Sequence, residues 1–174
     1  YVTSRDITTA SVLSNAGVPP QLCGDVYGCI RTYPIRVGNI IENGVQMGTS
    51  GPYYTDQVEL TWEDLRDRSG AQFSLEEITT VTKRVRRVFT YSPRQFQRFL
   101  RVCYPTHIFI NFVNHLDASV LGMRTWGELT EPVKHFVKAV ESDCAELEYA
   151  GLSTPKISHL GTGAKQSDMV TLWE

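Results

Sequence analysis

The run His-Ile-Phe-Ile-Asn-Phe-Val at residues 107–113 is the most strand-like segment of this 174-residue chain. Apolar side chains occur at odd and even positions of the run, which is typical of a strand buried on both faces in a parallel sheet. Asn114 follows it directly. Because ligands bind beyond the carboxyl ends of strands in open α/β sheets, the sequence predicts a ligand-binding role for Asn114.

The other expected elements alternate strands with helices. Their patterns predict strands at 26–33, 156–160 and 168–173, and helices at 8–16, at 131–149 and after the caps Thr61 and Ser92. Ser92-Pro93-Arg94-Gln95 has the pattern of a capping box with a first-position proline. Residues 39–54 are rich in Gly, Asn, Ser and Thr, which predicts a long loop of the kind that often forms a lid. The alternation predicts a single α/β domain, with a mostly parallel sheet flanked by helices.

Residues 79–87, Thr-Thr-Val-Thr-Lys-Arg-Val-Arg-Arg, concentrate hydroxyl groups and positive charges in a chain whose net charge is -2. If this segment is extended, its side chains alternate between two faces, and Thr82, Arg84 and Arg86 share one of them. Guanidinium groups match the planar geometry of carboxylates and phosphates, so this face would suit a small acidic ligand. An exposed edge strand that carries solvated charge explains the same pattern equally well.

Composition argues against several classes of protein. The net charge of -2 disfavours a general nucleic-acid-binding protein, and no apolar run is long enough to predict a membrane span. The cysteines and histidines have neither CxxC pairs nor metal-ligand spacing, which favours reduced thiols in a cytoplasmic protein and no metal site. These residues are Cys23, Cys29, Cys103, Cys144, His107, His115, His135 and His159. The chain opens on Tyr1 without a signal-like segment, so we expect that a longer polypeptide precedes it.

Four blocks of the sequence carry a family resemblance: 1–4 (Tyr-Val-Thr-Ser), 32–38 (Thr-Tyr-Pro-Ile-Arg-Val-Gly), 82–87 (Thr-Lys-Arg-Val-Arg-Arg) and 161–163 (Gly-Thr-Gly). In this order and spacing they resemble the C-terminal half of adenylosuccinate synthetases. The segments most similar to the branch from phages that make 2-aminoadenine DNA are 3–6, 54–57, 59–63, 79–89 and 111–112. The resemblance implies a P-loop-NTPase-like ligase fold, with the phosphate loop and the catalytic residues in the other half of the protein.

The resemblance also implies a purine nucleotide ligase. In this family a nucleoside triphosphate phosphorylates O6 of a purine nucleoside monophosphate, and the amine of L-aspartate then displaces that phosphate at C6. The phage branch implies dGMP as the acceptor, whereas the wider family implies IMP. Mg2+ would take part, with ligands outside this chain, and members are usually homodimers. Two other hypotheses stay open. The second hypothesis is a non-catalytic module that binds nucleotide or aspartate. The third, much less favoured, is nucleic-acid binding by the arginines of 84–87.

Carried over by position, the family's binding residues form three groups. The monophosphate would contact Thr3, the backbone of Val37, and Arg84. L-aspartate would be held by Val81, Thr82, Arg84 and Arg86. The base of the triphosphate would meet Phe112, Asn114, Gly161, Gly163 and Ala164.

Three positions depart from the family pattern. Asn114 stands where most members have an aspartate, which only accepts hydrogen bonds and so suits the N1–H and amino donors of guanine. Asparagine both donates and accepts, as the N1 acceptor and N6 amino group of adenine require, so we expect ATP or dATP rather than GTP as the phosphoryl donor. Lys83 replaces a glycine and Val81 a threonine, so the backbone of the loop 79–87 need not follow that of the family.

Overall fold

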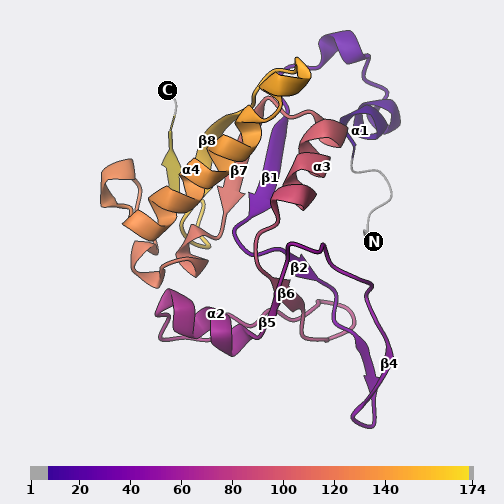
Figure 1. Cartoon of the computed structure of the whole chain (residues 1–174), viewed down its shortest axis with the longest axis vertical. Helices are drawn as coiled ribbons and strands as arrows, with labels where there is room; N and C mark the ends of the chain where they lie inside the picture. Colours follow the sequence, from indigo (N-terminus) through magenta and orange to yellow (C-terminus); the bar gives the residue numbers. More distant parts are fainter. Residues whose placement is uncertain (1–7, 173–174) are drawn as a thin grey trace.

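The computed structural model of this chain describes residues 8–172 (Figure 1). Its centre is a four-stranded sheet with the strand order β1–β7–β8–β9. Strands β1 (Tyr27–Arg31), β7 (His107–Asn111) and β8 (Lys156–Gly161) are parallel, and β9 (Met169–Thr171) is antiparallel to β8. The predicted mostly parallel sheet is confirmed, and the carboxyl ends of its three parallel strands meet at one edge.

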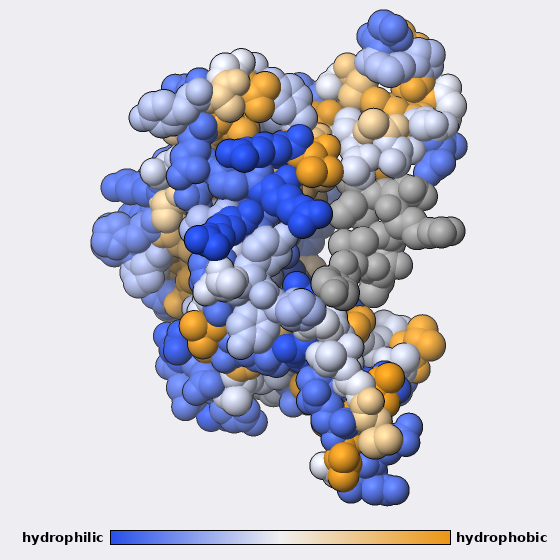
Figure 2. All heavy atoms as spheres, turned by 45° about the vertical axis from the view of Figure 1, so that its right-hand side comes forward, coloured by the Kyte–Doolittle hydropathy of each residue, from blue (hydrophilic) through white to orange (hydrophobic). Residues whose placement is uncertain are grey.

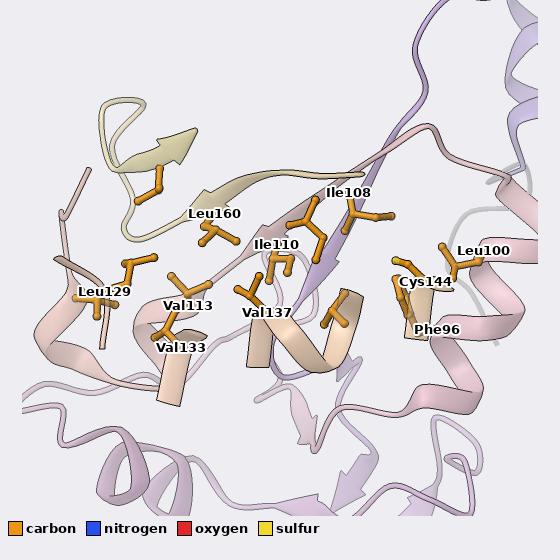
Figure 3. Packing of buried hydrophobic residues seen from close by; sticks show 14 of the residues in the cluster. Phe96, Leu100, Ile108, Ile110, Val113, Leu129, Val133, Val137, Cys144 and Leu160 are labelled. Carbon is orange, nitrogen blue, oxygen red and sulfur yellow. The ribbon is translucent and has the colours of Figure 1, made fainter. Parts of the chain in front are cut away.

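Helices α3 (Pro93–Cys103) and α4 (Glu131–Ala145) pack against one face of this sheet. In Figure 3, Val137 of α4 lies close to Ile110 of β7, within a single cluster of buried apolar side chains. Complete burial of a valine, leucine or isoleucine side chain stabilises a fold by about 1.5–3 kcal/mol. This shared core therefore fixes how both helices lie on the strands.

The two faces of β7 are not equally buried. Ile108 and Ile110 are fully buried toward α3 and α4, whereas His107 and Phe109 on the opposite face are only partly buried. On that face the Tyr27 ring stacks on His107, with ring centroids 4.8 Å apart. The prediction of a strand buried on both faces is wrong for the described residues, because both helices pack on the same side.

A smaller unit adjoins the carboxyl edge of the main sheet. Its three short strands, β2 (Ile35–Arg36), β6 (Arg87–Phe89) and β5 (Glu59–Leu60), pair antiparallel in that order. Helix α2 (Trp62–Ser69) begins with a capping box at Thr61, as predicted from the cap, and shares a separate apolar core with these strands. Because α2 also contacts the turn that follows β7, the small unit is held beside the strand ends of the large one.

The segment predicted to be a long loop contains a β-hairpin. Strands β3 (Ile40–Glu42) and β4 (Val45–Gly48) pair antiparallel around Asn43 and Gly44, whose φ values are 52° and 77°. Asn-Gly readily adopts these positive φ values in hairpin turns, so the turn chemistry outweighs the loop-like composition. The hairpin projects from the body of the molecule, and apolar side chains are exposed on it (Figures 1 and 2).

Local capping signals predict two further helices correctly. Helix α1 (Thr9–Ala16) begins at the cap Thr8 and ends at Gly17, whose φ is 66°. Ser92 caps α3 by accepting a hydrogen bond from the backbone N–H of Gln95 at 2.9 Å. The second half of the predicted capping box is wrong, because the Gln95 side chain accepts from Nε2 of Gln57 instead.

The remaining elements are short 3-10 helices. They are η1 (Pro20–Leu22), η2 (Val113–His115), η3 (Ala118–Val120), η4 (Trp126–Glu128) and η5 (Glu148–Ala150). The helix predicted at 131–149 is an α-helix only as far as Ala145, four residues short of the prediction. The 3-10 helix η5 then follows it. No helix within residues 8–172 has the length and apolar character needed to cross a membrane.

Candidate functional site

The arginine-rich segment forms a tight turn rather than an extended strand. An antiparallel bridge joins Ile78 to Val85, and the backbone N–H of Thr79 donates to the carbonyl of Arg84 at 2.9 Å. The buried Thr79 hydroxyl accepts from the backbone N–H of Arg84, also at 2.9 Å, and Lys83 has a φ of 52°. The predicted alternation of faces is wrong between 80 and 84, because these bonds from Thr79 close the chain into a turn.

The turn nevertheless brings two arginines to one groove. Arg84 and Arg86 line a cavity of about 450 Å³ together with Trp62 at the start of α2. Arg87 lines it too, but its guanidinium is already bound by both carboxylate oxygens of Glu59, at 2.7 and 2.6 Å. Within residues 8–172 the Arg84 guanidinium has no ion-pair partner. Glu63 and Glu76 line the same cavity, so the groove carries no surplus of positive charge, and the Arg84 guanidinium is the group in it that suits an acidic ligand.

Two of the predicted aspartate-binding residues lie away from this groove wall. Val81 is 90% exposed at the tip of the turn. The Thr82 hydroxyl shares a hydrogen bond with the hydroxyl of Thr79. Their predicted contacts with L-aspartate stay predictions.

Gly38 allows the segment after β2 to run against the arginine turn. A Cβ at Gly38 would overlap the carbonyl oxygen of Val85 and would lie 3.1 Å from Cβ of Arg84. The arginine turn therefore lies directly against the backbone at Gly38. Val37 precedes Gly38 in this segment, and its predicted contact with the monophosphate, like that of Arg84, stays a prediction.

We expect the variant Gly38→Ala to lower the free energy of unfolding by about 1–3 kcal/mol, because the new methyl group forces Val85 to move. The matched control is Gly24→Ala, since a Cβ at Gly24 has no neighbour within 4 Å. Thermal unfolding of the two variants measures the difference. Equal melting temperatures would contradict the close packing of these two segments.

Phe112, which links β7 to η2, has an unusual backbone conformation. Its φ is 64°, a left-handed value that is rare for residues other than glycine and that persists only where neighbours enforce it. The buried Thr32 hydroxyl donates to the Phe112 carbonyl at 2.7 Å. The Arg31 guanidinium covers the ring, with its central carbon 3.7 Å from the ring centroid. This side chain is therefore presented by the fold at the carboxyl edge of the sheet.

Asn114 and His115 are buried immediately after Phe112. Asn114 is 7% exposed in η2, and its side-chain amide makes no hydrogen bond with any residue in the described range 8–172. Nδ1 of His115 is also buried without a partner in that range. Burial, reinforced by the charge of Arg31, lowers the pKa of His115 from 6.5 to about 4, so the imidazole is neutral at neutral pH.

We expect His115 to make the protein less stable in acid, by about 3 kcal/mol between pH 6.5 and pH 4. Over this interval the unfolded state binds a proton that the folded state does not. The free energy of unfolding therefore has its full value above pH 6.5 and decreases as the pH falls toward 4. Denaturant unfolding at several pH values should show that His115→Gln removes this dependence. The control His135→Gln, at an exposed position of α4, should retain it. Identical pH profiles for both variants would refute the assignment.

The glycine that ends β8 and the one that follows two residues later leave room for other side chains of the protein. A Cβ at Gly161 would lie 2.9 Å from Oδ1 of Asn111, and one at Gly163 would press on the carboxylate of Asp168. Ala164 is exposed in the turn that follows. Because η2 packs against β8, this turn lies at the same edge of the sheet as Asn114. Contact of Gly161, Gly163 and Ala164 with a nucleobase stays a prediction.

Sequence reasoning missed two residues that join the halves of this site. Glu77 forms ion pairs with both Arg31 and Arg86. Arg31 is part of a strand-like run and Glu77 of an irregular segment, so neither carries a recognisable sequence signal. Thr3, the remaining predicted monophosphate ligand, lies outside the described residues.

The described residues offer no obvious metal site. Among residues 8–172, no three His, Cys, Asp or Glu side chains gather closely enough to hold an ion. We therefore assign none of these side chains to the Mg2+ that the family implies.

Comparison with known proteins adds decisive evidence. No family model matches the chain. The N6-succino-2-amino-2'-deoxyadenylate synthase of Vibrio phage phiVC8 is 40% identical over 151 residues, which are 87% of this chain. The adenylosuccinate synthetase of Archaeoglobus fulgidus is 32% identical over 144 residues, which are 82% of this chain. The chain is a relative of the adenylosuccinate synthetases. This confirms the resemblance inferred from the sequence blocks.

A solved structure supports the same relationship. The succinoaminodeoxyadenylate synthetase of Cyanophage S-2L, described as bound to dGMP and dATP as an energy donor, superposes with a TM-score of 0.71. The two are 31% identical, and the match covers 98% of this chain. The chain spans only 38%, 37% and 40% of the length of these three proteins, respectively, in keeping with a C-terminal portion of an adenylosuccinate synthetase.

Proposed function

We propose that this chain is the C-terminal part of a ligase that joins L-aspartate to C6 of a purine nucleoside 5'-monophosphate. The observation that carries the proposal is the groove in which Arg84 and Arg86 lie beside Trp62, with Arg84 free of any ion pair within residues 8–172. Two guanidinium groups at one cavity match the two carboxylates of aspartate. Val81 and Thr82 would complete the aspartate site from the tip of the turn.

The reaction has two steps. The γ-phosphoryl group of a nucleoside triphosphate is transferred to O6 of the purine, which releases the diphosphate. The amine of L-aspartate then attacks C6, the C6–O6 bond breaks, and inorganic phosphate leaves with O6. The residues that hold the phosphates, Mg2+ and the catalytic protons would belong to the part of the protein outside this sequence, so the residues described above act by binding and orienting the substrates.

dGMP is the favoured acceptor and ATP or dATP the favoured donor. The phage relatives are named for a 2-amino-2'-deoxyadenylate product, and the Cyanophage S-2L enzyme is described with dGMP and dATP bound. The monophosphate would lie along Thr3, the Val37 backbone and Arg84. The buried amide of Asn114 would pair with adenine, beside Phe112 and the turn at Gly161, Gly163 and Ala164. A cytoplasmic homodimer completes the proposal.

Phosphate release by the full-length protein tests this function. L-aspartate is supplied with dGMP or IMP and with ATP or GTP, in all four combinations, and each is repeated without aspartate as the control. Aspartate-dependent release with dGMP and ATP is the expected result. Turnover only with IMP and GTP would show that the protein uses the substrates of ordinary purine synthesis, and would contradict the assignment of dGMP and ATP. Binding of the substrates without turnover in any combination would favour the alternative, a non-catalytic nucleotide- and aspartate-binding module.

A further inference from the structure

Glu77 lies between two arginines that come from distant parts of the chain. Its Oε1 atom accepts a hydrogen bond from Nη2 of Arg31, and its Oε2 atom lies 3.8 Å from Nε of Arg86. The Glu77 carbonyl also accepts from the backbone N–H of Arg86 at 2.8 Å. Only 26% of the Glu77 side chain is exposed. The carboxylate is therefore held from both sides.

Arg31 connects the Glu77 carboxylate to Phe112, which follows β7. Its Nε donates to the carbonyl of Tyr33 at 3.3 Å, which fixes the plane of the guanidinium. That plane covers the ring of Phe112, whose backbone is held in its left-handed conformation by Thr32. A continuous set of contacts thus runs from Phe112 through Arg31 and Glu77 to Arg86.

Without Glu77, two like charges would face each other. Burial lowers the pKa of Arg31, Glu77 opposes that shift, and the nearby charge of Arg86 adds to it. The Glu77 carboxylate therefore relieves a repulsion between the two guanidinium groups. Because it approaches Arg86 at Nε, the two terminal nitrogens of Arg86 are left for the carboxylate of a ligand.

We infer that Glu77 and Arg31 are positioning residues that couple the nucleobase site at Phe112 to the aspartate site at Arg86. The inference rests on the proposed function and adds to it an energetic link between two substrates. A base against the exposed part of the Phe112 ring, which also contacts His115, fixes the ring beneath Arg31, and Glu77 then holds Arg86 where it binds aspartate. Such coupling is reciprocal, so bound aspartate strengthens triphosphate binding by the same factor.

Calorimetry on the full-length protein tests the coupling. L-aspartate binding is measured in the presence of the monophosphate, with and without a non-hydrolysable ATP analogue. We expect the analogue to tighten aspartate binding about tenfold in the unsubstituted protein and less than about twofold in Glu77→Gln, which keeps the shape of the side chain but not its charge. Glu131→Gln is the matched control, since Glu131 forms a pair with Lys134 on α4, 3.7 Å apart, and should keep the tenfold effect.

A second variant tests the contact of Arg31 with Phe112. It also keeps the inference testable if Glu77→Gln fails to fold. In Arg31→Lys the positive charge remains, but an ammonium group cannot cover Phe112, bind the Tyr33 carbonyl and reach Glu77 at once. The coupling should fall in this variant as well, and the double variant should lose no more than either single one. Melting temperatures and monophosphate affinity should stay close to those of the unsubstituted protein.

The possible outcomes separate this inference from the proposed function. Absence of coupling in the unsubstituted protein, an unchanged tenfold effect in a folded variant, or additive losses would overturn the inference. Phosphate release is measured in parallel. A protein that binds all three substrates with the expected coupling, yet never releases phosphate, would refute the ligase and leave the link intact.

Discussion

Replacing Arg86 with alanine in the full-length protein should reduce kcat/KM for L-aspartate about 100-fold and leave the affinity for the purine monophosphate nearly unchanged. Each hydrogen bond between charged groups contributes roughly 1.5–3 kcal/mol, and a bidentate contact contains two of them. Loss of about 3 kcal/mol of transition-state binding corresponds to about two orders of magnitude in rate. The effect should fall on aspartate, because Arg86 lies in the groove and is steered by Glu77.

Arg101→Ala provides the control for this experiment. Arg101 is an exposed arginine in the last turn of α3, outside the groove, so its removal changes the net charge equally. Steady-state kinetics with aspartate and monophosphate varied separately give the two KM values. If Arg86→Ala weakens both substrates equally, the assignment of Arg86 to aspartate is wrong.

Asn114→Asp should move the phosphoryl-donor preference from ATP toward GTP by roughly 100-fold or more. In the unsubstituted protein the buried amide can donate to N1 of adenine and accept from its N6 amino group. An aspartate offers acceptors only, which leaves the adenine N1 acceptor unsatisfied while it pairs with the donors of guanine. Each unpaired buried polar group costs about 1–3 kcal/mol, and the substitution changes the balance for both bases.

The preference is measured as the ratio of kcat/KM for ATP and GTP under identical conditions. Asn15→Asp makes the same chemical change at an exposed position of α1, and its ratio should equal that of the unsubstituted protein. If the ratio of kcat/KM for ATP and GTP in Asn114→Asp stays within experimental error of the control, Asn114 does not determine which base is bound.

Local signals predicted the parts of the fold that depend on neighbouring residues. The caps Thr61 and Ser92 begin helices where expected, because a side-chain oxygen bonds a backbone N–H only three residues away. The same reasoning failed at the Asn43-Gly44 turn, where loop-like composition obscured a hairpin signal that two residues carry.

The candidate site was predicted in part. Asn114 lies at the carboxyl edge of the sheet because η2, which contains it, follows β7 after Phe112 alone, and strand order along the chain was enough to place it there. The grouping of Arg84 with Arg86 was also expected, but for a reason that proved wrong. They share a groove because Thr79 closes a turn, and not because an extended strand alternates its side chains.

Consecutive residues were enough to predict the strands and helices of the main sheet, the arginine-rich segment and the family resemblance, since periodicity, caps and residue blocks are local properties, whereas the short strands of the smaller unit and the hairpin were missed. Which arginines are available to a ligand depends on long-range contacts: Glu59 neutralises Arg87, whereas Glu77 pairs with Arg86 and joins it to Arg31. Only the tertiary structure decided that both helices cover one face of β7 and that Gly38 packs against Val85. These outcomes depend on contacts between residues far apart in the chain, which no local pattern encodes.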